Sequence, residues 1–147
     1  MTYKLITTSY PSGYNLASKY AGVLILSTGS IGGTGLKLAT AANVGNDGAI
    51  VADFAASNAN NGISVNAGAT IRNGSATQSA SIEGYSGIFA TSAPVTVHNY
   101  SLIQGFGPGG DGVFAVAGGL VTNGAANDVT AKIVGARSGV VANALAT

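Results

Sequence analysis

Residues 62–73 read GISVNAGATIRN, and residues 87–99 repeat the same pattern as GIFATSAPVTVHN. In both stretches a glycine precedes an aliphatic residue, and an asparagine follows the glycine 11 or 12 positions later. Apolar residues two positions apart, such as Ile63 and Val65, share one face of an extended chain. The pattern is therefore typical of short β-strands, and its recurrence predicts a repeat protein.

The repeat extends over most of the chain. The Gly-aliphatic pair recurs at nearly even spacing, beginning at Gly35, Gly62, Gly87, Gly112 and Gly139. An aliphatic-x-Asn motif follows the first four pairs and ends at Asn46, Asn73, Asn99 and Asn123. An isoleucine then closes each unit, at Ile50, Ile82, Ile103 and Ile133. The step from asparagine to isoleucine alternates between short and long, so we expect length variation to be confined to this corner of the repeat.

Three aliphatic positions in each unit predict three inward-facing columns. When units stack about 4.8 Å apart, equivalent residues lie above one another. The first column comprises Leu36, Ile63, Ile88, Val113 and Val140. The second comprises Val44, Ile71, Val97 and Val121, and the third comprises the four isoleucines that close the units. We therefore predict an all-β fold, a right-handed parallel β-helix (a β-solenoid) of about five turns of roughly 25 residues with three strands per turn.

The glycine and asparagine columns are expected to form the corners of this solenoid. A corner requires residues that can adopt positive φ, and glycine and asparagine do so most readily. Asparagine side chains that stack can also hydrogen-bond to one another through their amides. We therefore expect the asparagine column both to adopt the corner conformation and to form an amide ladder.

The N-terminal segment, residues 1–21, fits the repeat less well. Four of the six tyrosines lie between Tyr3 and Tyr20, together with Pro11. An open solenoid end exposes unpaired strand edges, and solenoids cover such ends with atypical terminal units. We expect residues 1–21 to form a cap or a pair of edge strands, and residues 22–147 to form the β-helix as a single domain. The unit that begins at Gly139 is incomplete, which we interpret as a cut or as an end that a neighbouring chain continues.

Composition excludes several classes of function. The chain has 147 residues, of which 7% are charged, with a net charge of +1, 23 glycines and no cysteine. A small charge without basic clusters gives no electrostatic footprint for nucleic acid. The lack of cysteine excludes disulfide frameworks, thiol catalysis and thiolate metal sites. Gly, Asn or Ser interrupts every stretch long enough to span a bilayer as a helix, so we expect no membrane insertion by this chain.

The five acidic residues are expected to be solvated loop charges. They are Asp47, Asp53, Glu83, Asp111 and Asp128. A glycosidase needs two carboxyl groups roughly 5–10 Å apart, and only Asp47 and Asp53 lie within one unit. Arg72 and Arg137 have no acidic cluster near them in the sequence, whereas lyase chemistry with Ca²⁺ would require one. We therefore expect a protein that is not an enzyme, with no catalytic, cofactor-binding or metal-binding residues and no cofactor.

Two further motifs are expected to have no chemical role. His98, the only histidine, should face outward near Arg72 and Thr122, and a lone histidine cannot form a metal site. The glycine-rich run at 105–110 is expected to be a turn. It lacks the Lys-Ser/Thr pair and the following helix of a phosphate-binding loop.

One aromatic pair could form a contact surface. Phe89 and Phe114 follow the inward residues of two successive units, so both should project outward and stack, with Val141 continuing the column. A contiguous apolar stripe on a sheet face is typical of a contact surface. The alternative is that a long corner, at Ser75–Ser81 or Ala125–Ala131, folds over the stripe.

The repeat units resemble the β-helical repeats of bacterial autotransporter passenger regions and related adhesin-like surface proteins. The resemblance covers roughly residues 22–147 and includes the Ile-x-Gly motifs at 82–84, 103–105 and 133–135. It implies a secreted protein that is extracellular or on the bacterial cell surface. We therefore expect a structural β-solenoid, a stalk or adhesin-like segment that contacts a host or cell-surface ligand of unknown identity.

Two alternative functions remain open. A self-assembling subunit of an extracellular fibre would stack end to end into a homo-oligomer or filament, and a net charge near zero does not oppose this. The second alternative is a different surface activity, either a polysaccharide-processing enzyme or an ice-binding face. Ice binding would need a flat array of threonines, and Thr70, Thr96 and Thr122 do not hold one phase.

Overall fold

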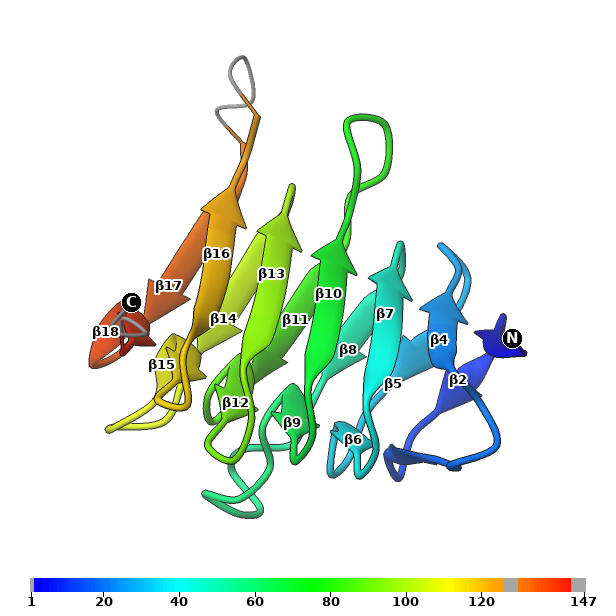
Figure 1. The fold of residues 1–147 in the computed structure, drawn as a ribbon, viewed down its shortest axis with the longest axis horizontal. Helices are drawn as coiled ribbons and strands as arrows, with labels where there is room; N and C mark the ends of the chain where they lie inside the picture. Colours follow the sequence, from blue (N-terminus) through cyan, green and yellow to red (C-terminus); the bar gives the residue numbers. More distant parts are fainter. Residues whose placement is uncertain (1, 126–129, 144–147) are drawn as a thin grey trace.

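The structure, a computed structural model, describes residues 2–125 and 130–143. The described chain forms three parallel β-sheets of six strands each, and it visits the three sheets in turn before returning to the first (Figure 1). None of these described residues is helical. The predicted all-β fold, a parallel β-helix with three strands per turn, is therefore confirmed.

The strands of each sheet follow one another along the long axis of the molecule, from the N-terminus to the C-terminus (Figure 1). Sheet A comprises β1 (Tyr3–Ile6), β4 (Gly22–Ile25), β7 (Ala42–Asn46), β10 (Ala69–Asn73), β13 (Val95–Asn99) and β16 (Gly119–Asn123). Sheet B comprises β2 (Ser9–Tyr10), β5 (Ser30–Ile31), β8 (Ala49–Val51), β11 (Ser81–Gly84), β14 (Leu102–Gly105) and β17 (Lys132–Gly135). Sheet C comprises β3 (Tyr14–Leu16), β6 (Leu36–Leu38), β9 (Ile63–Val65), β12 (Ile88–Ala90), β15 (Asp111–Ala115) and β18 (Ser138–Ala142).

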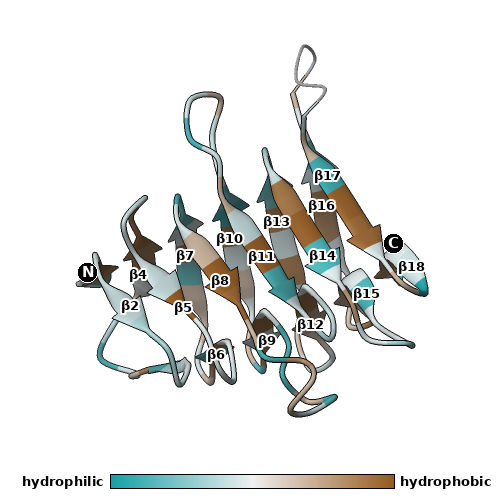
Figure 2. Ribbon diagram, turned by 180° about the vertical axis from the view of Figure 1, so that it is seen from behind, coloured by the Kyte–Doolittle hydropathy of each residue, from teal (hydrophilic) through white to brown (hydrophobic). Residues whose placement is uncertain are grey.

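The three predicted inward columns are confirmed. Equivalent residues pair in register on adjacent strands, as Ile63 does with Ile88 and Ile88 does with Val113. The interior members of each column are buried, and the last members, Val121, Ile133 and Val140, are partly exposed on the edge strands β16, β17 and β18. Apolar bands recur from strand to strand (brown in Figure 2). The core is therefore one continuous stack of aliphatic layers.

The N-terminal segment forms the first turn of the same solenoid. The predicted strand pair is in fact three strands, β1, β2 and β3, which pair in parallel with β4, β5 and β6 and lie at the edges of the three sheets. The first two turns, from Tyr3 to its partner Gly22 and from there to Asn43, are shorter than the turns that follow. In the asparagine column these turns carry Ile6 and Ile25. The repeat signature is absent here because the turns are shorter and isoleucine replaces asparagine.

The expectation that asparagine adopts the corner conformation is wrong. No described residue other than glycine has a positive φ. Asn73 ends strand β10 in an extended conformation, and Gly74, which follows it, has a φ of +71°. Gly124 has a φ of +76° after Asn123 in the same way. Glycine takes the left-handed conformation because it has no Cβ atom to clash, which leaves the asparagine free to point its amide inward.

Length variation is also not confined to one corner. We call the connections from sheet A to sheet B the asparagine corner, which comprises residues 47–48, 74–80, 100–101 and 124–131 in the last four turns. We call the connections from sheet B to sheet C the glycine corner, which comprises residues 52–62, 85–87, 106–110 and 136–137. Both corners vary in length, and the longest connection belongs to the glycine corner.

The glycine of the Gly-aliphatic motif is required by close packing. A Cβ atom at Gly87 would lie 2.6 Å from the carbonyl oxygen of Gly112 and 2.6 Å from Cγ2 of Ile103. Gly62 and Gly112 have equivalent clashes with the next turn and with the isoleucine column. Only Gly35 of this column has a positive φ. Glycine is therefore needed at most positions of this column because successive turns approach closely, and not because of a special backbone conformation.

Candidate functional site

A ladder of buried amides joins sheet A to sheet B at the asparagine corner. The Nδ2 atoms of Asn46, Asn73 and Asn99 donate to the Oδ1 atom of the next asparagine at 2.8, 2.9 and 2.7 Å. These three side chains have no exposed surface. Each Nδ2 also donates to a backbone carbonyl leading into or within sheet B, such as Leu102 at 2.9 Å from Asn73. The predicted amide ladder is therefore confirmed, and it is structural.

A second polar ladder, at the glycine corner, was not predicted. Asn61 Oδ1 accepts from the backbone N–H of Ser86 at 3.0 Å, and Ser86 Oγ accepts from the N–H of Asp111 at 3.2 Å. The three residues are 6%, 3% and 1% exposed. Each immediately precedes the glycine of the Gly-aliphatic motif. The short polar residue before each of these glycines is the sequence feature from which this ladder could have been predicted.

Two of the acidic residues form ion pairs between turns. Asp47 Oδ1 accepts from Arg72 Nη1 at 2.7 Å, and Oδ2 accepts from Nη2 at 3.0 Å. Asp111 accepts from Arg137 through both carboxylate oxygens, with Oδ1 at 3.1 Å from Nε. These hydrogen bonds raise the pKa of Arg72 and of Arg137 above the usual value.

The expectation that these two acids are solvated loop charges is therefore wrong, because each is paired with an arginine. Each arginine reaches its carboxylate from the following turn, so the partners are far apart in the sequence. Stacking of the turns brings them together, and a search for acids and arginines close in sequence cannot find such a pair.

The remaining acids do not gather around a common point. Asp47 and Asp53 lie beyond opposite ends of β8, and Asp53 Oδ1 accepts from the N–H of Ala56 at 3.2 Å within its own loop. Glu83 is half-buried on β11, and Asp128 lies outside the described residues. Within residues 2–125 and 130–143, no three His, Asp or Glu side chains are grouped so that they could hold a metal ion.

His98 and the threonines lie where the repeat predicts. His98 pairs with Arg72 on one side and with Thr122 on the other, and its side chain is half-buried on the outer face of sheet A. Thr70 pairs with Thr96, but the next residue in that column is Leu120. The three threonines thus do not form one column.

The glycine-rich run at 105–110 is a turn that covers Tyr85. The N–H of Gly110 donates to the carbonyl of Gly107 at 2.7 Å. A Cβ atom at Gly107 would lie 2.0 Å from the ring of Tyr85. The turn also places Phe106 against Phe54, with the ring centres 5.2 Å apart. Glycine is needed here because the backbone lies directly against an aromatic ring.

The aromatic pair stacks on the outer face of sheet C, as predicted. The rings of Phe89 and Phe114 are 5.3 Å apart and inclined by 11°, and Val141 pairs with Phe114 in the next turn. The guanidinium of Arg137 lies 5.3 Å from the Phe114 ring. Both phenylalanines are half-buried. The outward column is therefore partly covered by side chains of its own turns.

Residues 74–80 of the asparagine corner do not cover this pair. Residues 74–80 leave β10 at the end opposite to the connections that flank β9 and β12 (Figure 1). Ala125–Ala131 belongs to the same corner, and its residues 126–129 lie outside the described part of the chain. Instead, residues 52–62 of the glycine corner run beside β9 (Figure 1). The loop beside Phe89 therefore belongs to the glycine corner, whose variation in length the repeat pattern does not predict.

A hollow lies between this glycine-corner loop and Phe89. It is lined by Asn58, Ala59, Asn61, Ser64, Asn66, Tyr85 and Phe89. We call it the Phe89 slot. It combines the aromatic rings of Tyr85 and Phe89 with amide and hydroxyl groups, and polar groups of this kind fix the orientation of a bound ligand.

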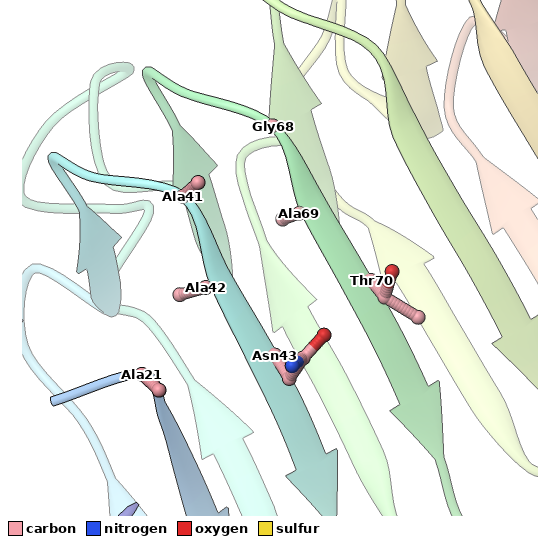
Figure 3. A pocket seen from close by; sticks show the side chains of 7 residues that line it. All are labelled: Ala21, Ala41, Ala42, Asn43, Gly68, Ala69 and Thr70. Atoms are coloured by element: carbon pink, nitrogen blue, oxygen red, sulfur yellow. The ribbon is translucent and has the colours of Figure 1, made fainter. Parts of the chain in front are cut away.

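A second hollow lies at the start of strands β4, β7 and β10 of sheet A. It is lined by Ala21, Ala41, Ala42, Asn43, Gly68, Ala69 and Thr70. Figure 3 shows that these side chains are short and that only Asn43 and Thr70 carry polar atoms. The Phe89 slot offers more groups that could orient a ligand, so we regard it as the candidate site.

Comparisons with protein-family models, with curated proteins and with solved structures find no match for this chain. Among the described residues there is no helix with the length and hydropathy of a membrane span.

Proposed function

We propose that this chain is a non-enzymatic structural β-solenoid, a stalk or adhesin-like segment of an extracellular or bacterial cell-surface protein. The observation that supports this proposal most strongly is the continuity of its stacked columns. Aliphatic columns run through the interior, and polar ladders run along two corners. Each turn is thus bonded to the next by backbone, side-chain and apolar contacts together. Such a molecule can act as an elongated spacer along the solenoid axis.

The use of charge supports the same role. The chain has only six Lys or Arg residues and five Asp or Glu residues. Four of these charges form the Asp47–Arg72 and Asp111–Arg137 pairs, which tie one turn to the next. Lys4 and Lys19 lie over the rings of Tyr10 and Tyr20 in the first turn. Much of the scarce charge thus contributes to contacts within the scaffold.

Immunolabelling of the source cells tests the proposed location. Antibodies raised against the purified chain should label intact, unpermeabilised cells or their culture medium. Treatment of intact cells with an external protease should remove the label. Labelling that requires lysis of the cells would contradict an extracellular or surface location.

A second candidate function, a subunit of a self-assembling extracellular fibre, is favoured by the sheet edges. Strands β16, β17 and β18 are edge strands in the three sheets, and Val140 is 43% exposed there. Strands β1, β2 and β3 form the opposite edges with the same direction. A second copy can therefore add in parallel by main-chain hydrogen bonding.

Sedimentation and electron microscopy test the fibre proposal. The chain should form elongated particles that lengthen as its concentration rises. The variant Val140→Lys should remain monomeric because a lysine on an edge strand opposes strand addition. If the unaltered chain is monomeric at every concentration, the fibre proposal fails and the stalk proposal is unaffected.

A further inference from the structure

We propose that the Phe89 slot binds one pyranose ring of an uncharged carbohydrate. This site is additional to the scaffold role and does not depend on it, because a stalk and a fibre subunit would both present it on the outer face of sheet C. The inference is drawn from the order of residues in one outward column, from the groups around the slot and from the anchoring of its wall.

The slot lies where Ser64 replaces the phenylalanine that the next two turns have in the same outward column. The outward column of sheet C runs through Ser64, Phe89 and Phe114 in three successive turns. The two phenylalanine rings stack nearly parallel, at a separation close to the spacing of the turns. One face of Phe89 is therefore turned toward Phe114 and the other toward the preceding turn. Because serine is small, that second face opens into the slot.

The groups around this open face suit a sugar. The side chains of Asn58, Ser64, Asn66 and Tyr85 line the slot, and within the described part of the chain they make no hydrogen bond. They offer amide and hydroxyl groups that both donate and accept, which matches the hydroxyls of a pyranose. The exposed C–H face of the same ring would lie on Phe89, whose ring face carries partial negative charge.

Charge complementarity points to an uncharged ligand. Each residue that lines the slot has a neutral side chain. The nearest cation in the outward column, Lys37, lies one turn beyond Ser64 and is not among the lining residues. A carboxylated or phosphorylated sugar would find no partner for its charge in the slot. A neutral hexose or N-acetylhexosamine has no charge that needs such a partner.

Two hydrogen bonds of Asn60 and Asn61 hold the C-terminal end of the slot wall. Asn60 Nδ2 donates to the carbonyl of Asp53 at 2.8 Å, which closes the loop on itself. Asn61 Oδ1 accepts from the N–H of Ser86 in the next turn at 3.0 Å. A wall held in this way reduces the conformational entropy that a ligand would have to overcome. The slot is thus largely preformed.

Ligand-observed NMR and calorimetry on the full chain test this inference. The probes are neutral oligosaccharides built from glucose, galactose, mannose or N-acetylglucosamine, with phenol as an aromatic comparison. We expect at least one oligosaccharide to bind, and Phe89→Ala to weaken its binding at least tenfold. The matched control is Tyr100→Ala, which removes an aromatic ring at the asparagine corner, away from the slot and its wall, and should change affinity less than twofold.

The variant Ser64→Phe provides the sharper test. Its ring should continue the stack of Phe89 and Phe114, fill the slot and abolish binding, while the melting temperature is unchanged or raised. Binding that survives in a folded Ser64→Phe protein would overturn the inference. So would the failure of every oligosaccharide to bind, or binding of phenol alone. None of these results would affect the scaffold proposal, which is tested by localisation and assembly.

Discussion

Asn73 makes hydrogen bonds on three sides of one buried corner. Its amide accepts from Asn46, donates to Asn99 and donates to the carbonyl of Leu102 in sheet B. The residue therefore links three turns and two sheets, although it occupies one position of a strand. In the later turns asparagine gives buried carbonyls such as that of Leu102 a hydrogen-bond donor, which Ile6 and Ile25 do not provide in the first two turns.

Replacing this amide should destabilise the solenoid. We expect Asn73→Ala to lower the free energy of unfolding by about 1–3 kcal/mol for each polar group left buried without a partner. Thr70→Ala, on the exposed side of the same strand, is the control and should change it by less than about 0.5 kcal/mol. Urea denaturation measures both values. Equal stabilities for the two variants would show that the ladder contributes nothing.

The glycine column gives a second prediction at this scale. Gly87→Ala should lower the free energy of unfolding by about 1–3 kcal/mol, because its Cβ would overpack against Gly112 and Ile103. Gly68→Ala is the control, since its Cβ would lie 3.7 Å from the carbonyl oxygen of Pro94 and meet nothing closer. Thermal unfolding compares the two. A Gly87→Ala protein as stable as Gly68→Ala would contradict the close approach of the turns.

The two arginines should differ in importance. Arg137→Ala should lower the melting temperature more than Arg72→Ala. The carboxylate left by the first change has a side chain that is 1% exposed, and that left by the second is 25% exposed. Circular dichroism during heating measures the difference. The reverse order would mean that Asp111 reaches water more readily than its burial indicates.

At the scale of the strands, much of the architecture follows from the sequence. The three aliphatic columns and the asparagine column pair in the register that the motif spacing predicts. That register is readable because a residue facing the interior of a solenoid must match its neighbours above and below. The first turn was harder to recognise. Its shorter length and Ile6 at the asparagine position leave no recurring motif to detect.

The features that the sequence did not predict involve contacts between turns at variable corners. The Asp47–Arg72 pair depends on the precise stacking of two strands, and the Phe89 slot depends on the path of residues 52–62. A motif search aligns equivalent positions and leaves such insertions unplaced. Phe89 and Phe114 were nevertheless correctly placed on the outer face, because strand alternation fixes the direction of each side chain.

The asparagine corner should tolerate a change of length. Residues 74–80 occupy a corner that two other turns close with residues 47–48 and 100–101. Replacing 74–80 by Asp-Gly should change the free energy of unfolding by less than about 1 kcal/mol, since loop-closure entropy varies slowly with length. Inserting the same dipeptide after Val97, within β13, should prevent folding because it shifts the strand register. A shortened protein that does not fold would show that residues 74–80 are needed for the corner.

The whole molecule is organised by the parallel stacking of successive turns in one register. Stability, the open sheet edges and the Phe89 slot all follow from it. Adjacent parallel strands place paired Cα atoms within the range that a disulfide bond can bridge. The chain has no cysteine, so engineered cysteine pairs report on register without interference.

Disulfide formation between adjacent turns is the most direct test. Thr70→Cys with Thr96→Cys places two thiols on paired positions of β10 and β13, and Thr70→Cys with His98→Cys places them out of register on the same two strands. Under mild oxidation, mass spectrometry should find rapid and complete disulfide formation in the first protein and little in the second. Equal rates in the two proteins, or a faster reaction in the second, would contradict the parallel stacking.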